Sequence, residues 1–435
     1  MPAEQSYELI QGPERAFLVG IGIKGSRPLL TTEDSLAELT LLAKTAGMDV
    51  VGTTSQNVNH FDPATMIGSG KVEEVREALV AADAHTVIFD DELTPRHQRE
   101  LEERFGEDIK VLDRSALILD IFAQHARTHE GALQVELAQY EYRLPRLTRQ
   151  WTHLSRQAGG TSGAVGLRGP GETQLEVDRR EIRRRISRLK QELEKVREHR
   201  SRHRQQRNRS GIPLVALVGY TNAGKSTLLH TLSGADVYIA DQLFATLDPT
   251  TRRVDLPNGT QILLTDTVGF IQKLPTTLIA AFRATLEEIT EADLILEVVD
   301  LNEPNASGHI ETVEDTLAEI DVPPIPRILV WNKTDKFKGE TIPEVSDPQQ
   351  YFDIVAISAA KNQGLDKLAA AISRAVSFTL YQIKLFIPYE RGDLVSQLHE
   401  QAAVHQQIAK DTGIELTVRL PANLFEQFKQ YRISG

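Results

Sequence analysis

Eight residues, from Gly219 to Ser226, have the composition and spacing of a phosphate-binding loop. Every fixed position of the pattern G-x-x-x-x-G-K-[ST] is met. The two fixed glycines allow a sharp turn that points successive N–H groups at phosphate oxygens. Lys225 would reach the terminal phosphates, and the Ser226 hydroxyl is a candidate Mg²⁺ ligand. The loop residues are Gly219, Tyr220, Thr221, Asn222, Ala223, Gly224, Lys225 and Ser226.

The segments on either side of this loop would place it between a strand and a helix. Leu214–Val218 is a short apolar run of strand length, and Thr227–Leu232 has the composition of a helix start. A strand, a glycine-rich loop and a helix in this order form the context that the motif needs, and they argue against a chance glycine turn. We therefore expect the loop, with Thr227 included, to bind the phosphates of a nucleotide.

A threonine-rich segment before the strand Arg252–Leu256 is the second candidate for phosphate and metal binding. Thr246 lies where a threonine should complete the Mg²⁺ shell, together with Ser226, when a γ-phosphate is present. Thr250 is the alternative ligand. The segment contributes the candidate nucleotide contacts Phe244, Ala245, Thr246, Leu247 and Asp248.

An Asp-x-x-Gly sequence follows the strand Gln261–Thr265. The carboxylate of Asp266 can bind Mg²⁺ through water, and the N–H of Gly269 can contact the γ-phosphate. The candidate contacts of this segment are Asp266, Thr267, Val268 and Gly269.

The residue after Gly269 is informative because it is not glutamine. Many GTPases use a glutamine at this place to orient the attacking water, whereas Phe270 cannot bind water. We therefore expect slow intrinsic hydrolysis of the nucleotide, and a partner surface or a cation that aligns the attacking water. The side-chain oxygen of Asn222 is a candidate ligand for K⁺, although it could instead brace the loop by local hydrogen bonds. The candidate catalytic residues are Lys225, Gly269 and Asn222.

The choice of base can be argued from a motif after the strand Arg327–Trp331. The carboxylate of Asp335 can accept two hydrogen bonds from N1–H and the 2-amino group of guanine, and adenine offers neither. A loop after the strand Ile354–Ile357 would donate a backbone N–H to guanine O6. The residues of the two segments are Asn332, Lys333, Thr334 and Asp335, then Ser358, Ala359 and Ala360.

Composition places few limits on function, but the distribution of charge is uneven. The 435 residues contain no cysteine, which excludes disulfides and thiolate metal sites, and the net charge is −12. No signal peptide or membrane-spanning run is expected. Residues 143–210 nevertheless hold nineteen Lys and Arg against seven Asp and Glu. This segment is suited to a polyanion while the rest of the chain is acidic.

Residues 113–209, which include most of this basic segment, have the apolar spacing of two paired helices. Each of two runs repeats apolar residues at intervals of four and three, and a glycine-rich stretch at 158–171 separates them. We expect an antiparallel hairpin with a flexible tip, in which Trp151 and His153 either stack on bases or pack. The two seams are Leu133, Leu137, Tyr140, Leu144 and Leu147, then Ile182, Ile186, Leu189, Leu193 and Val196.

These elements predict an α/β multidomain protein with four domains. Residues 1–112 read as an α/β subdomain with a parallel sheet, and 113–209 as the basic helical hairpin. Residues 210–376 form the nucleotide domain with a mainly parallel sheet, and 377–435 a small α+β domain. Within the first, Gly68–Lys71 looks like a second phosphate loop but fails the pattern, so a plain turn into a helix is expected there.

The order of motifs resembles the HflX-type GTPases of the translation-factor-related class. The resemblance rests on the phosphate loop, the two switch segments, the guanine motif, the tip 159–174 and Ile67–Val72. It implies a cytoplasmic GTPase with Mg²⁺ on Ser226 and Thr246. It also implies binding to the large ribosomal subunit and its rRNA near the peptidyl-transferase centre, and the splitting of stalled ribosomes under stress. Contact with membranes would then occur only through ribosomes.

Two functional interpretations of the hairpin stay open at this point. In the first, a monomeric, ribosome-stimulated GTPase inserts its basic hairpin into rRNA. In the second, a signalling or membrane-associated GTPase uses the hairpin as a protein-dimerisation arm. Salt-sensitive RNA binding by residues 113–210 favours the first, and a concentration-dependent dimer favours the second.

Overall fold

The computed structural model describes residues 12–25, 29–106, 108–147, 170–208, 212–234, 242–274, 286, 288–339, 341–379, 381–401, 403–420 and 428–433. The chain forms two compact units. The first comprises Met1–Glu192 with the segments Asp241–Ala245 and Gln272–Phe282. The second comprises Leu193–Ala240, Thr246–Ile271 and Arg283–Gly435.

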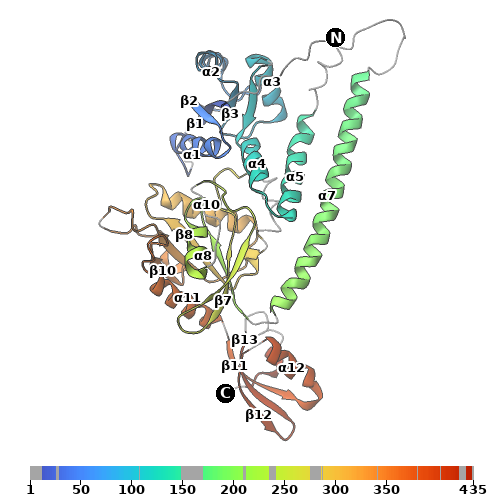
Figure 1. Cartoon of the computed structure of the whole chain (residues 1–435), viewed down its shortest axis with the longest axis vertical. Coiled ribbons are helices and arrows are strands. Elements are labelled where there is room, and N and C mark those ends of the chain that lie inside the picture. Colours follow the sequence, from blue (N-terminus) through green and yellow to red (C-terminus); the bar gives the residue numbers. More distant parts are fainter. Residues whose placement is uncertain are drawn as a thin grey trace. The chain divides into compact units, whose positions relative to one another are not determined.

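A four-stranded sheet with the order β2-β1-β3-β4 is the core of the first unit (Figure 1). All three strand pairs are parallel, as the alternation of strands and helices predicts. The strands are β1 (Arg15–Ile23), β2 (Asp49–Val58), β3 (Thr86–Phe89) and β4 (Lys110–Asp113), and the helices are α1 (Thr32–Thr45), α2 (Ser69–Ala81), α3 (Pro95–Phe105) and α4 (Arg114–His125).

Side-chain caps fix where several of these helices begin. Thr31, Thr94 and Asp113 each accept a hydrogen bond from a backbone N–H in the first turn of α1, α3 and α4. Such a cap satisfies one of the N–H groups that a helix start leaves without a partner. Asp113 also ends β4, so one residue sets both the end of a strand and the start of a helix.

The look-alike loop Gly68–Lys71 is a turn into α2, as expected. Gly68 is the N-cap of this helix. Lys71 Nζ lies 2.7 Å from Glu74 Oε1 and 3.2 Å from Thr54 Oγ1, so the ammonium is held by its neighbours on α2 and β2. The Lys71 ammonium is therefore paired with a carboxylate of the protein, whereas the lysine of a phosphate loop binds phosphate oxygens.

A buried polar cluster follows β3 in the first unit. Asp90 is 1% exposed and accepts hydrogen bonds from Ser35 Oγ at 2.6 Å and Arg114 Nη1 at 2.7 Å. Lys273 Nζ, from the segment Gln272–Phe282, lies 2.5 Å from Asp90 and 2.7 Å from Asp91. Burial raises the pKa of Asp91, although Lys273 opposes this shift. Each charge in the cluster therefore has an opposite partner.

Two helices with opposite directions form the predicted hairpin (Figure 1): α5 (His129–Arg143) and α7 (Pro170–Asn208). Ion pairs join Glu136 to Arg185 at 2.7 Å and Glu141 to Lys190 at 2.8 Å. The predicted seams are buried at Leu133, Leu137 and Leu189, while their other members are partly exposed.

The bounds of the two helices correct the sequence-based expectation. The first seam implies a helix through Leu147, but α5 ends at Arg143 and a 3-10 turn, η1 (Leu144–Arg146), follows. Pro145 lacks an N–H and cannot continue the α-helix. Pro170, which we assign to the tip, is instead the first residue of α7, a position that suits proline. The tip residues 158–169, with Trp151 and His153, lie outside the described residues.

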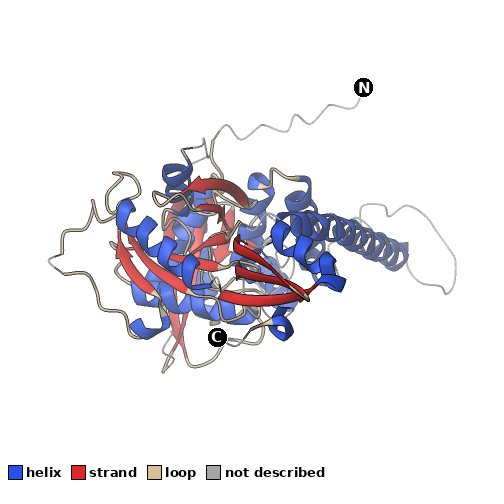
Figure 2. Cartoon of the chain, turned by 90° about the horizontal axis from the view of Figure 1, so that it is seen from below, coloured by secondary structure: helices blue, strands red, loops and turns tan. Residues whose placement is uncertain are grey.

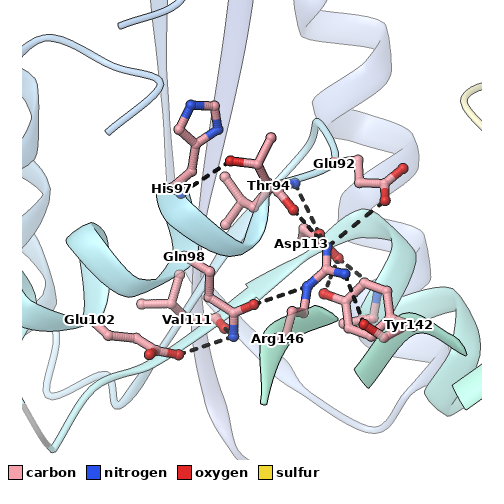
Figure 3. A network of polar contacts seen from close by, with 11 residues as sticks. Glu92, Thr94, His97, Gln98, Glu102, Val111, Asp113, Tyr142 and Arg146 are labelled. Carbon is pink, nitrogen blue, oxygen red and sulfur yellow. Dashed lines mark hydrogen bonds and ion pairs between the residues drawn. The ribbon is translucent and has the colours of Figure 1, made fainter. Parts of the chain in front are cut away.

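Arg146 anchors the end of this first helix to the sheet (Figure 3). Its guanidinium donates to Leu93 O at 2.6 Å, Tyr142 O at 2.9 Å, Gln98 Oε1 at 3.2 Å and Asp113 Oδ2 at 3.3 Å. It also lies over the Tyr142 ring, 3.5 Å from the centroid, and Tyr142 donates to Asp113 Oδ1 at 2.9 Å. Burial, reinforced by Asp113, raises the pKa of Tyr142. The start of the predicted tip is therefore fixed on α3 and β4.

A six-stranded sheet with the order β10-β9-β8-β5-β7-β6 forms the core of the second unit. Its pairs are parallel except β6–β7, which is antiparallel. The strands are β5 (Leu214–Val218), β6 (Thr250–Asp255), β7 (Gln261–Asp266), β8 (Leu294–Asp300), β9 (Arg327–Asn332) and β10 (Asp353–Ala356), and the helices are α8 (Lys225–Ser233), α10 (Ala306–Glu319) and α11 (Leu365–Thr379).

Helices cover both faces of this sheet, and Figure 2 shows its strands in red among blue helices. One core joins α8 and α11 to alternate residues of the strands, such as Val298. Another joins α10 to the intervening residues, such as Val299 and Trp331. Because successive residues of a strand face opposite sides, adjacent members of β8 enter different cores. The apolar β8 strand is therefore buried on both faces.

A small antiparallel sheet, β11-β13-β12, packs with α12 (Gly392–Gln401) at the end of the chain. Its strands are β11 (Tyr381–Pro388), β12 (Ala403–Lys410) and β13 (Gly413–Leu420). The apolar pattern predicts a helix over Asp393–Val404, but α12 ends at Gln401 and Val404 belongs to β12. The sequence also predicts a short amphipathic helix at the end of the chain, with Leu424, Phe425, Phe428 and Tyr431 on its apolar face. Leu424 and Phe425 lie outside the described residues, and Lys429–Tyr431 form a 3-10 turn, η4.

Across the residues that the structure describes, none of the helices combines the length and apolar character that crossing a bilayer requires.

Candidate functional site

The predicted phosphate loop lies at the carboxyl end of β5, where it leads into α8. Gly219 and Gly224 have φ values of 145° and 96°, a region that residues with a side chain rarely adopt. A Cβ on Gly219 would lie 2.2 Å from Val298 O, and one on Gly224 would lie 2.3 Å from Asn332 Nδ2. The two fixed glycines are therefore required both by backbone conformation and by close packing.

Lys225 lies inside this loop and is only 5% exposed. Its Nζ donates to Gly219 O at 2.9 Å and to Tyr220 O at 2.8 Å. Burial lowers the pKa of Lys225 to about 8, and Asp266 opposes this shift. The ammonium is thus held by the loop's own carbonyl groups at the place where phosphate oxygens are expected.

Three oxygen-bearing side chains meet beside the start of α8. Ser226 Oγ donates to Asp266 Oδ2 at 2.6 Å and lies 2.8 Å from Thr246 Oγ1. The other carboxylate oxygen, Asp266 Oδ1, is buried and has no protein partner among the described residues, and burial raises the pKa of Asp266. Hydroxyl and carboxylate oxygens suit Mg²⁺. The group therefore fits the predicted metal site with Thr246, and Thr250 instead starts β6 opposite Asp266.

The Asp-x-x-Gly segment runs against the phosphate loop. Phe270 N donates to Gly219 O at 3.1 Å, and Thr221 N donates to Phe270 O at 2.8 Å. A Cβ on Gly269 would lie 2.8 Å from Thr221 Cα and 3.1 Å from Lys225 Nζ. Phe270 is 2% exposed and presents no polar group from its side chain. Within this segment, Thr267 Oγ1 donates to Leu217 O at 2.6 Å, and Val268 is buried.

The guanine motif and the phosphate loop share Asn332. Its Nδ2 donates to Ala223 O at 2.9 Å, and its Oδ1 accepts from Ala359 N at 3.1 Å. Ser358 Oγ donates to Asp335 Oδ1 at 2.5 Å, which holds the carboxylate in place while the side chain stays exposed. The two segments predicted to bind guanine are therefore brought together.

Two other predicted residues lie on loops and have positive φ values. Asn222 and Phe244 have φ values of 60° and 57°. Asn222 is exposed at the phosphate loop, as a cation ligand would be. Phe244 is buried within the first unit, where its ring lies 4.6 Å from that of Phe122, edge to face. Its side chain therefore packs within the first unit, and its predicted nucleotide contact stays a prediction. Leu247 is 2% exposed, while Ala245 and Asp248 are partly exposed.

Four protein-family models match the chain in the order of its elements. They are GTP-binding GTPase N-terminal at residues 33–123, GTP-binding GTPase Middle Region at 125–207, 50S ribosome-binding GTPase at 214–333 and HflX C-terminal domain at 346–430. The GTPase HflX of Caldanaerobacter subterraneus subsp. tengcongensis is 44% identical over 427 residues, which are 98% of this chain and 96% of that protein. The chain belongs to the HflX family of GTPases.

Two further comparisons each cover more than four fifths of the chain. The GTPase HflX of Escherichia coli is 43% identical over 416 residues, 95% of each chain. A GTP-binding protein from Sulfolobus solfataricus, solved in complex with GDP, aligns over 84% of this chain and 99% of that chain, with 24% identity and a TM-score of 0.42. The family confirms the resemblance expected from the motifs, so this chain is a GTP-hydrolysing HflX protein with a domain of the 50S ribosome-binding GTPase family.

A basic surface on α7 is the second candidate site of this HflX protein. Arg180, Arg183 and Arg184 are exposed, and Arg179 is partly exposed. By contrast, Arg185 pairs with Glu136 of α5. The side chains of the later arginines Arg200, Arg202, Arg204, Arg207 and Arg209 lie outside the described residues.

Sequence reasoning missed several residues that support the nucleotide site. His309 of α10 stacks on Tyr220 of the phosphate loop, with ring centroids 3.6 Å apart and planes at 2°. Burial lowers the pKa of His309 to about 4, so its ring is neutral at pH 7. Asp300, which ends β8, pairs with Lys333 at 2.9 Å. The only signal for Asp300 was a carboxylate at a strand end, which does not indicate its contact with Lys333, and His309 carried no signal.

Proposed function

We propose that residues 210–376 bind GTP with the phosphates on the loop Gly219–Ser226 and the base on Asp335. The observation that supports this most directly is the double hydrogen bonding of Asn332, which holds the phosphate loop and the guanine segment at fixed spacing. Lys225 would exchange its two carbonyl partners for phosphate oxygens. The N–H groups of the loop and of Gly269 would then bind the developing negative charge.

Ser226 and Thr246 are the proposed protein ligands of Mg²⁺, with Asp266 acting through water. Their convergence and the unpartnered, buried Asp266 Oδ1 support this assignment. A bound Mg²⁺ would neutralise charge on the β- and γ-phosphates. Thr246 would report whether a γ-phosphate is present, because it lies on a loop, whereas Ser226 lies on the rigid first turn of α8.

Hydrolysis would be slow in the isolated protein because Phe270 cannot orient water. We propose that two other contributions raise the rate. One is K⁺, held by the side-chain oxygen of exposed Asn222 near the phosphates, where its charge would act as an arginine does in other GTPases. The other is the ribosome. Hydrolysis in KCl and NaCl at equal ionic strength, with and without ribosomes, separates the two contributions, and Asn222→Ala should lose only the K⁺ effect.

The exposed arginines of α7 are the proposed contact with rRNA of the large ribosomal subunit. Arginine suits phosphate and base recognition, and the acidic residues in this part of the sequence are too few to neutralise all of these arginines. Leu133 and Leu137 of α5 and Leu189 of α7 are already buried within this chain, which leaves less apolar surface for a second copy of the chain. We therefore favour a free monomer over a dimerisation arm.

Binding of the GTP form near the peptidyl-transferase centre would let this protein split stalled ribosomes under stress, and hydrolysis would permit release. Such a protein would act in the cytoplasm and meet membranes only through bound ribosomes. The test is sedimentation with ribosomes and with separated subunits, comparing a GTP analogue with GDP. Binding to large subunits that requires the analogue, with loss of intact ribosomes, supports the proposal. Equal binding in both nucleotide states, or a dimer without RNA affinity, would overturn it.

A further inference from the structure

A short loop at the end of β8 holds the side-chain ammonium and the backbone carbonyl of Lys333, the second residue of the guanine motif. Asp300 ends β8 and lies beside Asn332 in the parallel register with β9. Its Oδ2 is 2.9 Å from Lys333 Nζ, and the two side chains are 20% and 21% exposed. Leu301 N donates to Asn332 O at 3.0 Å, which fixes this loop against the motif. The pair is therefore more sheltered than an ordinary surface ion pair.

The backbone of Lys333 is held in an unusual conformation by the same loop. Its φ of 63° lies in the left-handed region, which is unfavourable for a residue with a long side chain. Asn302 Nδ2 donates to Lys333 O at 3.0 Å and to Asp300 Oδ1 at 3.1 Å, and Asn302 N donates to Asp300 Oδ1 at 2.9 Å. These bonds stabilise a conformation that Lys333 would not adopt by preference.

The held lysine extends toward the phosphate loop. A Cβ on Gly224 would be 4.0 Å from Lys333 Cε, so the alkyl stem passes beside the last glycine of the loop. Lysine stems cover apolar surface while their ammonium groups stay at a polar partner. A stem fixed between the phosphate loop and Asp335 provides a surface on which the face of a purine ring can rest.

We propose that Asp300 and Asn302 are positioning residues for guanine recognition, because they hold the ammonium and the carbonyl of Lys333 and so fix its stem against the purine plane. The inference rests on the proposed nucleotide site and names residues that support it from a neighbouring strand. Asp335 would choose the base by its hydrogen bonds, and the Lys333 stem would strengthen binding of any purine so chosen.

The charge state of the loop agrees with this role. Burial would raise the pKa of Asp300, but hydrogen bonds from Lys333 and Asn302 lower it below its usual value. The carboxylate is therefore ionised at pH 7. The charge of Asp300 favours protonation of His309, but burial lowers the pKa of His309 to about 4. His309 is therefore neutral at pH 7 and does not compete with Lys333 for Asp300.

The experiment compares Asp300→Asn and Asn302→Ala with wild type in displacement titrations against a fluorescent GDP. We expect GDP and GTP affinities to fall by the same factor, roughly fivefold for Asp300→Asn. The preference for GTP over ITP should not change, since Asp335 reads the 2-amino group. The affinity for tripolyphosphate, which has no base, measured by its displacement of the fluorescent GDP, should be the same in the variants as in wild type. Asp353→Asn is the matched control, because Asp353 forms an ion pair with Arg374 at the opposite end of the parallel strands.

A double-substitution cycle separates positioning from general stability. Lys333→Met keeps a stem but removes the ammonium, so Asp300→Asn should add little to its effect. Asp300→Glu should recover part of the affinity. Unchanged GDP affinity in Asp300→Asn, or full additivity with Lys333→Met, would overturn the inference. If Asp300→Asn does not fold, the same cycle with Asn302→Ala in its place tests whether the loop acts through Lys333. Absence of guanine preference in the wild type would instead refute the nucleotide site itself.

Discussion

Lys225 and Arg183 are both basic side chains proposed to meet phosphate groups, yet the chain holds them in opposite ways. Lys225 is 5% exposed, has two carbonyl partners and has its pKa lowered by burial. Arg183 is exposed on a helix among other arginines. As proposed, the first region would recognise phosphate through fixed geometry, and the second through density of charge. Single substitutions should therefore disable the first, whereas the second should respond to total charge and to salt.

The strongest test of fixed geometry is Gly219→Ala. The added Cβ meets the backbone oxygen of Val298, which cannot move without distorting β8, so nucleotide affinity should fall more than about 100-fold. Gly70→Ala, in the look-alike loop, is the matched control, since nothing lies within 4 Å of the new atom. Titration with fluorescent GDP measures both. Near wild-type binding by folded Gly219→Ala would refute the assigned loop.

A slightly smaller effect is expected for Asp335→Asn. The amide presents a donor where guanine also donates, so GTP affinity should fall by roughly 100-fold while xanthosine nucleotides compete better. Competition by GTP and XTP, together with a thermal melt to confirm folding, measures this change. Unaltered GTP affinity would show that Asp335 does not bind the base.

The basic helix should require several substitutions for a comparable loss. Replacing Arg179, Arg180, Arg183 and Arg184 with Glu should weaken ribosome binding by roughly 30-fold and flatten its dependence on salt. Nucleotide binding should be retained. The charge-matched control replaces Arg76, Arg96, Arg104 and Lys110 of the first unit, which are exposed. An equal loss in the control would mean that net charge, and not α7, directs binding.

The metal ligands should show a difference between nucleotides. Ser226→Ala should weaken Mg²⁺-dependent binding of GDP and GTP by roughly 10-fold, since Ser226 lies on α8 in either state. Thr246→Ala should spare GDP and reduce only the affinity for a GTP analogue. Titrations with and without Mg²⁺ distinguish these effects. If Thr246→Ala behaves as wild type, Thr250 is the ligand to substitute next.

The smallest effect concerns pH and distinguishes Lys225 from the arginines. The pKa of Lys225 is about 8 in the folded, nucleotide-free protein and 10.5 as a free side chain. Lys225 therefore loses its proton at a lower pH in the folded protein than in the unfolded chain. GDP affinity should fall by up to roughly tenfold between pH 7 and pH 9. The stability of the nucleotide-free protein should gain a favourable contribution from about pH 8 to 10.5, because the unfolded chain binds more protons there. Urea melts and GDP titrations across this range should therefore change in opposite directions.

Local pattern explains how much could be predicted from the sequence. Leu214–Val218 and the phosphate loop were predictable because apolar runs and fixed glycines act within a few residues. The end of α5 at Arg143 could have been predicted from Pro145. By contrast, β12 is rich in residues that also suit helices, and only its pairing with β13 makes it a strand. The contacts of Asp300 with Lys333 and of His309 with Tyr220 join distant segments, so no local pattern indicates them.

The sharing of Asn332 between base and phosphate segments has a consequence for the release of product. Its amide donates to Ala223 O on one side and accepts from Ala359 N on the other, and it lies so close to Gly224 that a Cβ there would meet its nitrogen. A nucleotide bound as proposed should not loosen its base while the phosphate loop stays unchanged, since one side chain connects the two segments. Dissociation of GDP should therefore be a single cooperative opening, with a rate set by distortion of this amide and its neighbours. A factor that displaces either segment would then accelerate the departure of the whole nucleotide.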